Sequence, residues 1–219
     1  MKKIFRRSLS VFLLLCLCGS LLAANVSAHE IYYTGSFPNY TGISLVWNER
    51  SAGKAYLKAD GHLLNSFYSG YYKTAVNAWP NASSCVKVTF TDFDHSNLNL
   101  ATGTTNFWKS MFGNLVNNVY GYCESISTDG YTISNATVAK NCSRKIRYAT
   151  AYYTPYTSNF DGNTTYVKKV MVHEIGHALG LGHPDGEYYP TNAASVMTSS
   201  RTSYWTPQAH DKTDLNNKY

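Results

Sequence analysis

The spacing of apolar and polar residues predicts alternating strands and helices along most of the chain. Runs rich in β-branched and aromatic residues predict strands at 43–47, 86–91, 118–123 and 146–153. Helical spacing predicts helices at 65–79, which Pro80 should end, and at 164–179. A last helix is expected to start at Thr206-Pro207, and the Asn-rich residues 92–103 are expected to form a loop. This order predicts an α/β fold with a mixed, twisted sheet.

The helix expected at 164–179 should have one buried side. Its apolar residues recur at helical spacing, at Val167, Val170, Met171 and Ala178. Asp161-Gly162-Asn163 precedes it and has the composition of a turn and a helix cap. After Gly180 the pattern is irregular until the last helix. The region after the helix is therefore expected to contain little regular structure.

The N-terminal segment has the composition of a secretory signal peptide. Its basic residues are Lys2, Lys3, Arg6 and Arg7, and they are followed by the mostly apolar residues 9–22. Val26-Ser27-Ala28 offers small residues for cleavage after Ala28. We expect a signal peptide at 1–28 and one secreted, extracellular domain at 29–219. The alternative is an uncleaved anchor, although no later stretch is long and apolar enough to span a membrane.

The charge balance changes once the signal peptide is set aside. Residues 1–28 hold four of the 19 basic residues and none of the 13 acidic ones, so the mature part has a net charge of +2. This is too little positive charge for a nucleic-acid-binding surface. The mature cysteines are Cys85, Cys123 and Cys142, an odd number that leaves one thiol over. Closeness in sequence favours a Cys123–Cys142 disulfide, with Cys85 as a free, buried thiol.

Residues 173–183 read H-E-I-G-H-A-L-G-L-G-H and form a candidate zinc site. His173 and His177 lie four residues apart, so their imidazoles share one face of a helix and can bind zinc together. Gly180 can end the helix in the left-handed conformation and return His183 as a third ligand. Glu174 is turned aside from this face and can act as a base towards a water molecule. A chance match to the full pattern is on the order of one in 10⁵; a histidine-rich surface helix is the alternative.

The motif resembles that of the metzincin metalloproteases, and the chain is most similar to small secreted matrixin-like peptidases. Residues 194–197 resemble the turn that places a methionine, here Met197, beneath the zinc. Asp211, Leu215 and Tyr219 match the C-terminal helix of matrixins, whereas His210 departs from it. Related families place a zinc-binding tyrosine two residues after this methionine. The residue here is Ser199, so no tyrosine ligand is expected.

The resemblance implies a fold with two halves. An upper half should contain the sheet and the active-site helix. A small irregular lower half should carry His183, Met197 and the C-terminal helix. Structural calcium or a second zinc could bind Asp92, Asp94 and His95, as in related enzymes, although a plain polar loop is the favoured interpretation of these residues.

The resemblance also implies a secreted zinc-dependent endopeptidase with one catalytic Zn²⁺. Glu174 would be the general base, and a protein or peptide substrate would add as a strand along 118–123. We expect a monomer without nucleic-acid partners and without stable membrane association after signal removal. The alternative is a non-catalytic secreted binding or adhesion protein on the same scaffold. Glu174 argues against it, because a binding scaffold needs no base there.

Overall fold

The computed structural model describes residues 46–133, 142, 143, 145–184 and 193–219. The expected signal peptide and its cleavage site at Ala28 therefore lie outside the described residues. So do residues 43–45 of the first expected strand, of which β1 (Val46–Trp47) is described. Within the described part of the chain, no helix has the length and apolar character needed to cross a membrane.

The fold is α/β, with one mixed sheet whose strand pairs are mostly parallel. The strands are β1, β2 (Arg50–Ser51), β3 (Lys54–Leu63), β4 (Val86–Phe90), β5 (Leu98–Thr102), β6 (Gly121–Ser127) and β7 (Lys145–Tyr153). Their order is β1-β7-β5-β3-β2, with β4 also paired to β3 and β6 also paired to β7. Among the strand pairs of the described residues, β2–β3 and β6–β7 are antiparallel and the others are parallel. The presence of both parallel and antiparallel pairs confirms the predicted mixed sheet.

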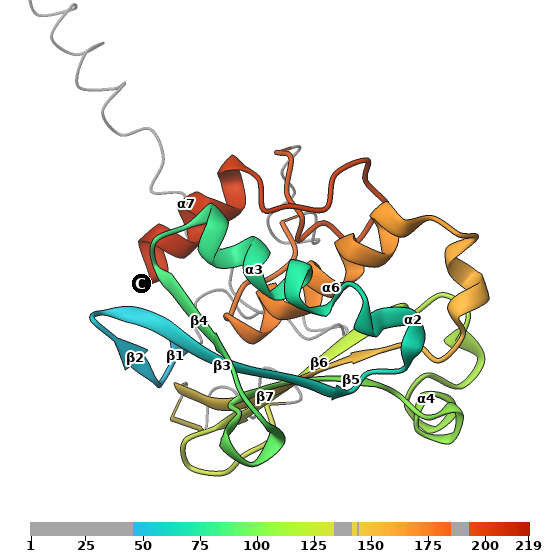
Figure 1. Cartoon of the computed structure of the whole chain (residues 1–219), viewed down its shortest axis with the longest axis horizontal. Coiled ribbons are helices and arrows are strands. Elements are labelled where there is room, and N and C mark those ends of the chain that lie inside the picture. The colour runs from blue at the N-terminus through green and yellow to red at the C-terminus, as the bar shows by residue number, and fades with distance from the viewer. Residues whose placement is uncertain (1–45, 134–141, 144, 185–192) are drawn as a thin grey trace, which may run out of the picture.

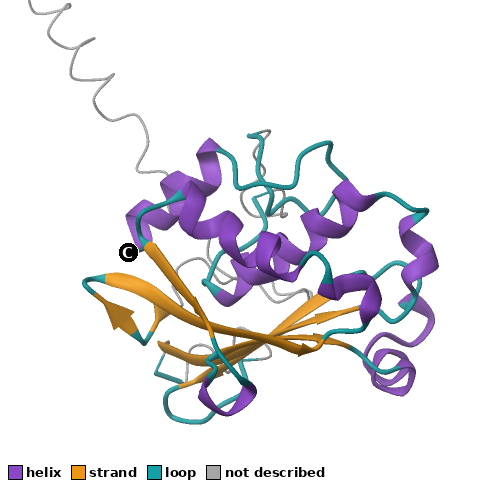
Figure 2. Cartoon of the chain, viewed as in Figure 1, coloured by secondary structure: helices purple, strands orange, loops and turns teal. Residues whose placement is uncertain are grey.

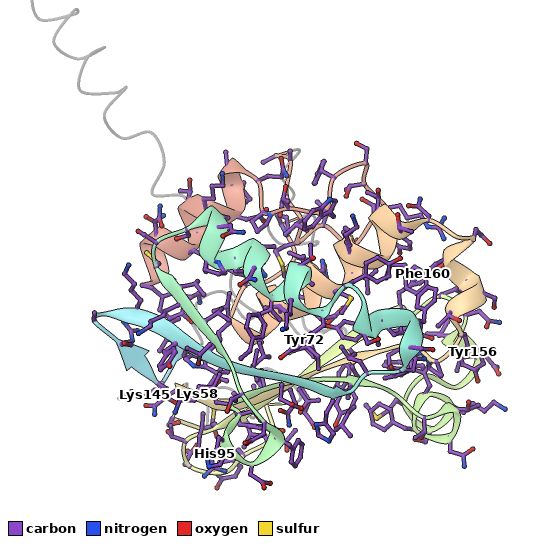
Figure 3. The ribbon with its side chains drawn as sticks, in the orientation of Figure 1. Lys58, Tyr72, His95, Lys145, Tyr156 and Phe160 are labelled. Carbon is purple, nitrogen blue, oxygen red and sulfur yellow. The ribbon has the colours of Figure 1, made fainter. Side chains whose placement is uncertain are left out.

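The helices gather mainly on one face of this sheet (Figures 1 and 2). Those that cover it are α2 (Ser66–Ser69), α3 (Tyr72–Ala82) and α6 (Thr164–Ala178), while α4 (Thr105–Phe112) follows β5 at one end and α7 (Ala209–Lys218) lies beside α3. Figure 3 shows Tyr72 between α3 and the sheet, where its hydroxyl donates to the Ala59 carbonyl at 2.7 Å. The core fills the layer between helices and sheet, with Trp47, Trp79 and Leu100 fully buried.

Several predicted elements are confirmed with small shifts in their bounds. The expected strands at 86–91 and 146–153 are β4 and β7, and the expected helix at 164–179 is α6. All four predicted apolar residues of α6 are buried. The expected strand at 118–123 begins later, at Gly121, and extends to Ser127. The last helix begins at Ala209, two residues after Pro207.

The prediction that Pro80 ends a single helix at 65–79 is wrong. Two helices, α2 and α3, occupy this region, and Pro80 lies inside α3. A proline costs a helix the hydrogen bond to the carbonyl four residues earlier, and its ring crowds that carbonyl. Only Asn81 and Ala82 follow Pro80 in α3, so the disruption falls in the last turn and ends the helix soon after.

The prediction that residues 92–103 form a loop is also wrong. They contain a short 3₁₀ turn, Phe93–His95, and the strand β5, which lies between β3 and β7 at the centre of the sheet. The Asn-rich composition suggested a loop, but an Asn side chain here forms hydrogen bonds with the backbone of the neighbouring strand. Asn97 accepts from the Lys58 amide at 2.7 Å and donates to the Tyr56 carbonyl at 3.0 Å. Because these partners satisfy it, a buried asparagine is compatible with a central strand.

The predicted Cys123–Cys142 disulfide is not formed. Cys85, Cys123 and Cys142 are all thiols, and Cys123 and Cys142 are both buried. Closeness in sequence does not bring two Cβ atoms to the separation of about 3.8 Å that a disulfide requires. The expectation that Cys85 is a buried thiol is wrong as well, since Cys85 is half-buried and its sulfur lies 3.3 Å from Asn216 Oδ1.

Candidate metal centre

The helix that carries the motif begins and ends where its local sequence requires. At the N-terminus, the Asn163 side chain accepts a hydrogen bond from the Tyr166 amide at 3.0 Å. At the C-terminus, Gly180 adopts φ +82°, which a residue with a Cβ rarely does. The Gly180 and Leu181 amides then bond to the His177 and Gly176 carbonyls at 2.9 and 3.0 Å. This turn sends the chain back towards the helix, as the glycine predicted.

The turn brings three histidines together. The Nε2 atoms of His173, His177 and His183 are separated by 2.9 Å (His173 to His183), 3.0 Å (His173 to His177) and 3.1 Å (His177 to His183). A tetrahedral zinc ion with bonds of 2.0–2.1 Å would hold its donor atoms about 3.3 Å apart. The spacing therefore fits a small metal ion at the centre of the three nitrogens.

In His173 and His177, the hydrogen bond at Nδ1 shows which tautomer of the ring is present. His173 Nδ1 lies 3.0 Å from the Val196 carbonyl oxygen, and His177 Nδ1 lies 2.8 Å from that of Leu181. A carbonyl oxygen only accepts, so both Nδ1 atoms carry the proton and both Nε2 atoms present lone pairs. Lone pairs that converge at this separation repel one another unless a cation lies between them. The three histidines are thus able to bind a metal ion.

Electrostatics keep these imidazoles neutral, the form that binds metal. Burial lowers the pKa of His177 to about 3, with a further contribution from His183. Burial also lowers the pKa of His173, and the positive charge of Lys169 adds to this effect. Both rings are therefore neutral and ready to coordinate a metal across the physiological range.

Glu174 lies beside the three histidines without joining them as a ligand. It is only 6% exposed, and burial raises its pKa to about 8, while Lys169 acts in the opposite direction. The start of β6 lies directly against it. A Cβ built on Gly121 would lie within van der Waals overlap of the Glu174 carboxyl group. The absence of a side chain at position 121 therefore makes room for the Glu174 carboxyl group.

Met197 packs against α6, the helix that carries His173 and His177. It is 1% exposed, and a Cβ on Gly176 would overlap its sulfur and the Trp79 ring. The same turn supplies the Val196 carbonyl that holds His173. The packing of this turn against α6 thus keeps the Val196 carbonyl beside His173.

Asp211 of α7 holds this turn in place. Its buried carboxylate accepts from the Ser195 hydroxyl, from the Val196 amide at 2.9 Å and from the Gln208 amide at 2.7 Å. The sequence marked Asp211 only as part of a helix pattern. Its spacing from Met197 gave no indication that it would bond to the turn.

Lys169 is a second residue that the sequence did not single out. Its ammonium group donates to the Thr198 carbonyl at 2.5 Å and lies 3.4 Å from His173 Nδ1, and the residue is 3% exposed. A signal was present, because Lys169 precedes His173 by four residues and so shares its helix face.

A cavity of about 320 Å³ extends from the histidines along α6, and we call it the α6 cavity. Its walls are residues 118–123, the α6 residues Tyr166, Lys169, Val170, His173, Glu174 and His177, and beyond the helix His183 and Ser199. The metal centre therefore opens into a hollow between the first residues of β6 and the segment after Met197.

The loop at residues 92–95 does not form a second metal site. The Asp92 carboxylate caps the 3₁₀ turn, accepting from the His95 amide at 3.1 Å and lying 2.5 Å from His95 Nδ1. His95 lies on the side of the sheet away from α6 (Figure 3). In the part of the chain that the structure describes, the three histidines are the one cluster of ligand residues able to hold a metal ion.

Comparison with protein-family models and with curated proteins produced no match to this chain.

Proposed function

We propose that the chain is a secreted zinc-dependent endopeptidase of the metzincin type, closest to the matrixins. The observation that carries the proposal is the convergence of three histidine Nε2 atoms next to the buried carboxyl group of Glu174, which lies against the start of β6. Zinc suits a set of three imidazole donors, and three protein ligands leave a coordination position for chemistry.

His173, His177 and His183 would hold the ion, and Val196 and Leu181 would orient the first two rings. Bound zinc would supply Lewis acidity to a carbonyl oxygen and to water. Glu174 would accept a proton from the attacking water on its carboxylate and deliver it to the leaving amine. A dication nearby favours ionised Glu174 over the protonated form that burial alone favours, so metal binding prepares the base.

The edge of the sheet provides a place for an extended peptide. β6 pairs with β7 on one side, and on the other side the Ser125 carbonyl accepts from the Ile133 amide at 2.8 Å. Because backbone groups alternate along a strand, those of Cys123 and Gly121 face the same outer side as Ser125. A peptide added there would run past Glu174, since Gly121 lies against that carboxyl group.

The test uses the purified secreted protein. We expect one zinc per chain by elemental analysis, cleavage of a diverse peptide library, loss of cleavage with a chelator and recovery on adding zinc. Glu174→Ala should retain zinc and lose cleavage by about 10³-fold or more, because one residue both accepts and donates the proton. N-terminal sequencing should begin at His29.

Two outcomes would contradict the proposal. One is a protein that neither contains zinc nor takes it up. The other is a Glu174→Ala variant that cleaves as well as the wild type. Peptide binding without cleavage in both proteins would favour the non-catalytic binding protein instead.

A further inference from the structure

A second cavity lies away from the metal centre, between α3 and the segment that leads into α7. Its volume is about 450 Å³, and we call it the α3 cavity. Among the described residues, none lines both this cavity and the α6 cavity. The volume falls within the range of about 300–1,000 Å³ that is typical of ligand sites. The proposed peptidase chemistry gives this cavity no role.

The sequence of α3 forms one wall of the cavity. Lys73, Asn77 and Asn81 recur every four residues, so they form one stripe along the helix. The stripe beside it contains Ala78 and Ala82, whose short side chains leave space above the helix. Each asparagine amide has two N–H donors and one carbonyl acceptor. This wall therefore surrounds the space with hydrogen-bonding groups and has little aliphatic surface.

The facing wall contains an aromatic ring, that of Trp205. This residue is half-buried, and its neighbour Pro207 is buried. The ammonium group of Lys168, on α6, lies 4.9 Å from the centre of the Trp205 ring and holds the indole in position. A fixed indole in a polar cavity provides a flat apolar surface against which a ring of the ligand can pack.

The charge around the cavity is positive. Lys73 and Lys212 line it and are exposed, and Lys168 adds a third ammonium group beside the indole. Lys73 also lies 5.6 Å from the centre of the Phe90 ring, a weak contact at an exposed site. None of the described lining residues is acidic, and Asp211, next to Lys212, is buried and already accepts hydrogen bonds from neighbouring hydroxyl and amide groups. The cavity therefore favours an anion.

We propose that the α3 cavity binds an acidic saccharide, a uronic acid unit of a polysaccharide. The sugar ring would pack on Trp205, its hydroxyls would exchange hydrogen bonds with Asn77 and Asn81, and its carboxylate would bind Lys73 or Lys212. An acidic peptide would satisfy the lysines as well, but peptide side chains are usually received by mainly apolar pockets. The inference depends neither on zinc nor on cleavage.

The experiment measures binding by calorimetry with the purified secreted protein. The probes are trisaccharides of galacturonic acid and of glucuronic acid, and the neutral trisaccharides of galactose and glucose, in which a hydroxymethyl group replaces each carboxylate. We expect at least one acidic trisaccharide to bind about tenfold or more tightly than its neutral counterpart. This ratio should fall as salt is added, because the lysines are exposed. A tri-aspartate peptide should bind more weakly than the acidic trisaccharide.

Two sets of variants separate the ring from the charges. Trp205→Ala should weaken binding of the acidic trisaccharide by about tenfold or more, because the packing surface is lost. Lys73→Met combined with Lys212→Met should bring the ratio of acidic to neutral binding near one. The matched control is Lys109→Met with Lys145→Met, which removes the same charge at exposed positions outside the cavity and should keep the wild-type ratio.

Three outcomes would overturn the inference. They are acidic trisaccharides that bind no better than neutral ones, an aspartate peptide that binds as tightly as the saccharide, and an equal loss in the control pair, which would make binding a matter of net charge. Thermal unfolding is measured for every variant. Should Trp205→Ala fail to fold, the lysine variants at exposed positions decide the matter.

A last measurement separates this inference from the proposed function. Glu174→Ala should bind the acidic trisaccharide as the wild type does, because Glu174 lines the other cavity. Loss of binding in this variant would place the saccharide at the metal centre and overturn the inference. Binding by a protein that cleaves no peptide would support the α3 cavity as a saccharide site and contradict only the peptidase proposal.

Discussion

The region up to the end of α6 and the region after it are held together in different ways. The first is a hydrogen-bonded sheet covered by helices, with large side chains such as Trp79, Trp108 and Leu57 fully buried. The described residues of the second, 179–184 and 193–219, contain one helix, α7, and bury fewer apolar side chains, among them Leu181, Met197 and Leu215. Specific polar contacts take the place of an extended core in the second region.

Two of these contacts tie the second region to the first: Lys169 of α6 holds the Thr198 carbonyl, and Tyr219 contacts Trp47. A third lies within the second region, where Asp211 holds the turn at residues 195–197. The Tyr219 hydroxyl donates to the Leu179 carbonyl at 2.8 Å and accepts from the Trp47 amide at 2.9 Å. The metal centre draws two ligands and the base from the first region and His183 from the second. Its geometry therefore depends on a few hydrogen bonds as well as on the core.

The largest effect on this arrangement should come from Asp211→Ala. Its removal leaves the buried Ser195 hydroxyl and two backbone amides without their acceptor, so we expect the free energy of unfolding to fall by about 4 kcal/mol. Zinc affinity should fall too, since Val196 orients His173. Denaturant unfolding and zinc titration measure both effects. Lys212→Ala, an exposed change on the same helix, should leave both unchanged, and equal effects for the two variants would contradict the role of Asp211.

In the metal-free protein, ionised Glu174 should lower the free energy of unfolding, because its carboxylate is buried in the first region. Its folded pKa of about 8 lies above the ordinary value of 4.5 for a glutamate, so the folded state binds the proton more tightly. The contribution of this group to stability is therefore lost as pH rises between these values. Metal-free Glu174→Gln should be more stable than metal-free wild type at pH 8, by on the order of 3 kcal/mol, and the gap should close towards pH 4. A gap that does not change with pH would contradict this.

Gly121→Val tests the contact between β6 and Glu174. A side chain there must displace the carboxyl group, so we expect kcat/KM to fall by about 100-fold while zinc content stays at one per chain. Gly130→Val is a control with open space around the Cβ but a positive φ of 89°, so it should cost stability and not catalysis. Full activity in Gly121→Val would show that the two groups are not pressed together.

Tyr219→Phe should have the smallest effect of the four. It removes only the hydroxyl that joins Trp47 to Leu179 and keeps the ring. We expect a loss of about 1–2 kcal/mol in the free energy of unfolding, with zinc binding nearly unchanged. Thermal unfolding of the two proteins side by side measures it. A large loss of zinc would mean that Tyr219 contributes to the site as well as to the contact between regions.

Elements with local signals could be predicted from the order of the residues. The His173-to-His183 spacing, the turn at Gly180 and the apolar side of α6 all depend on residues within a few helical turns of one another. The strands β4 and β7 are rich in β-branched and aromatic residues, and their positions were predicted closely. For the same reason the sequence was sufficient to place the three candidate ligands and Glu174 together.

Features that depend on partners far away in the chain could not be predicted in this way and are visible in the fold. Asn97 sits next to a central strand because Lys58 and Tyr56, far away in the chain, satisfy its amide. The role of Asp211 depends on where α7 docks. Cys123 and Cys142, which form no disulfide with each other, show that nearness in sequence does not set side-chain direction. A buried polar group is stable only where it has hydrogen-bond partners. In these cases the partners are far away in the chain, so folding brings them together and local spacing does not.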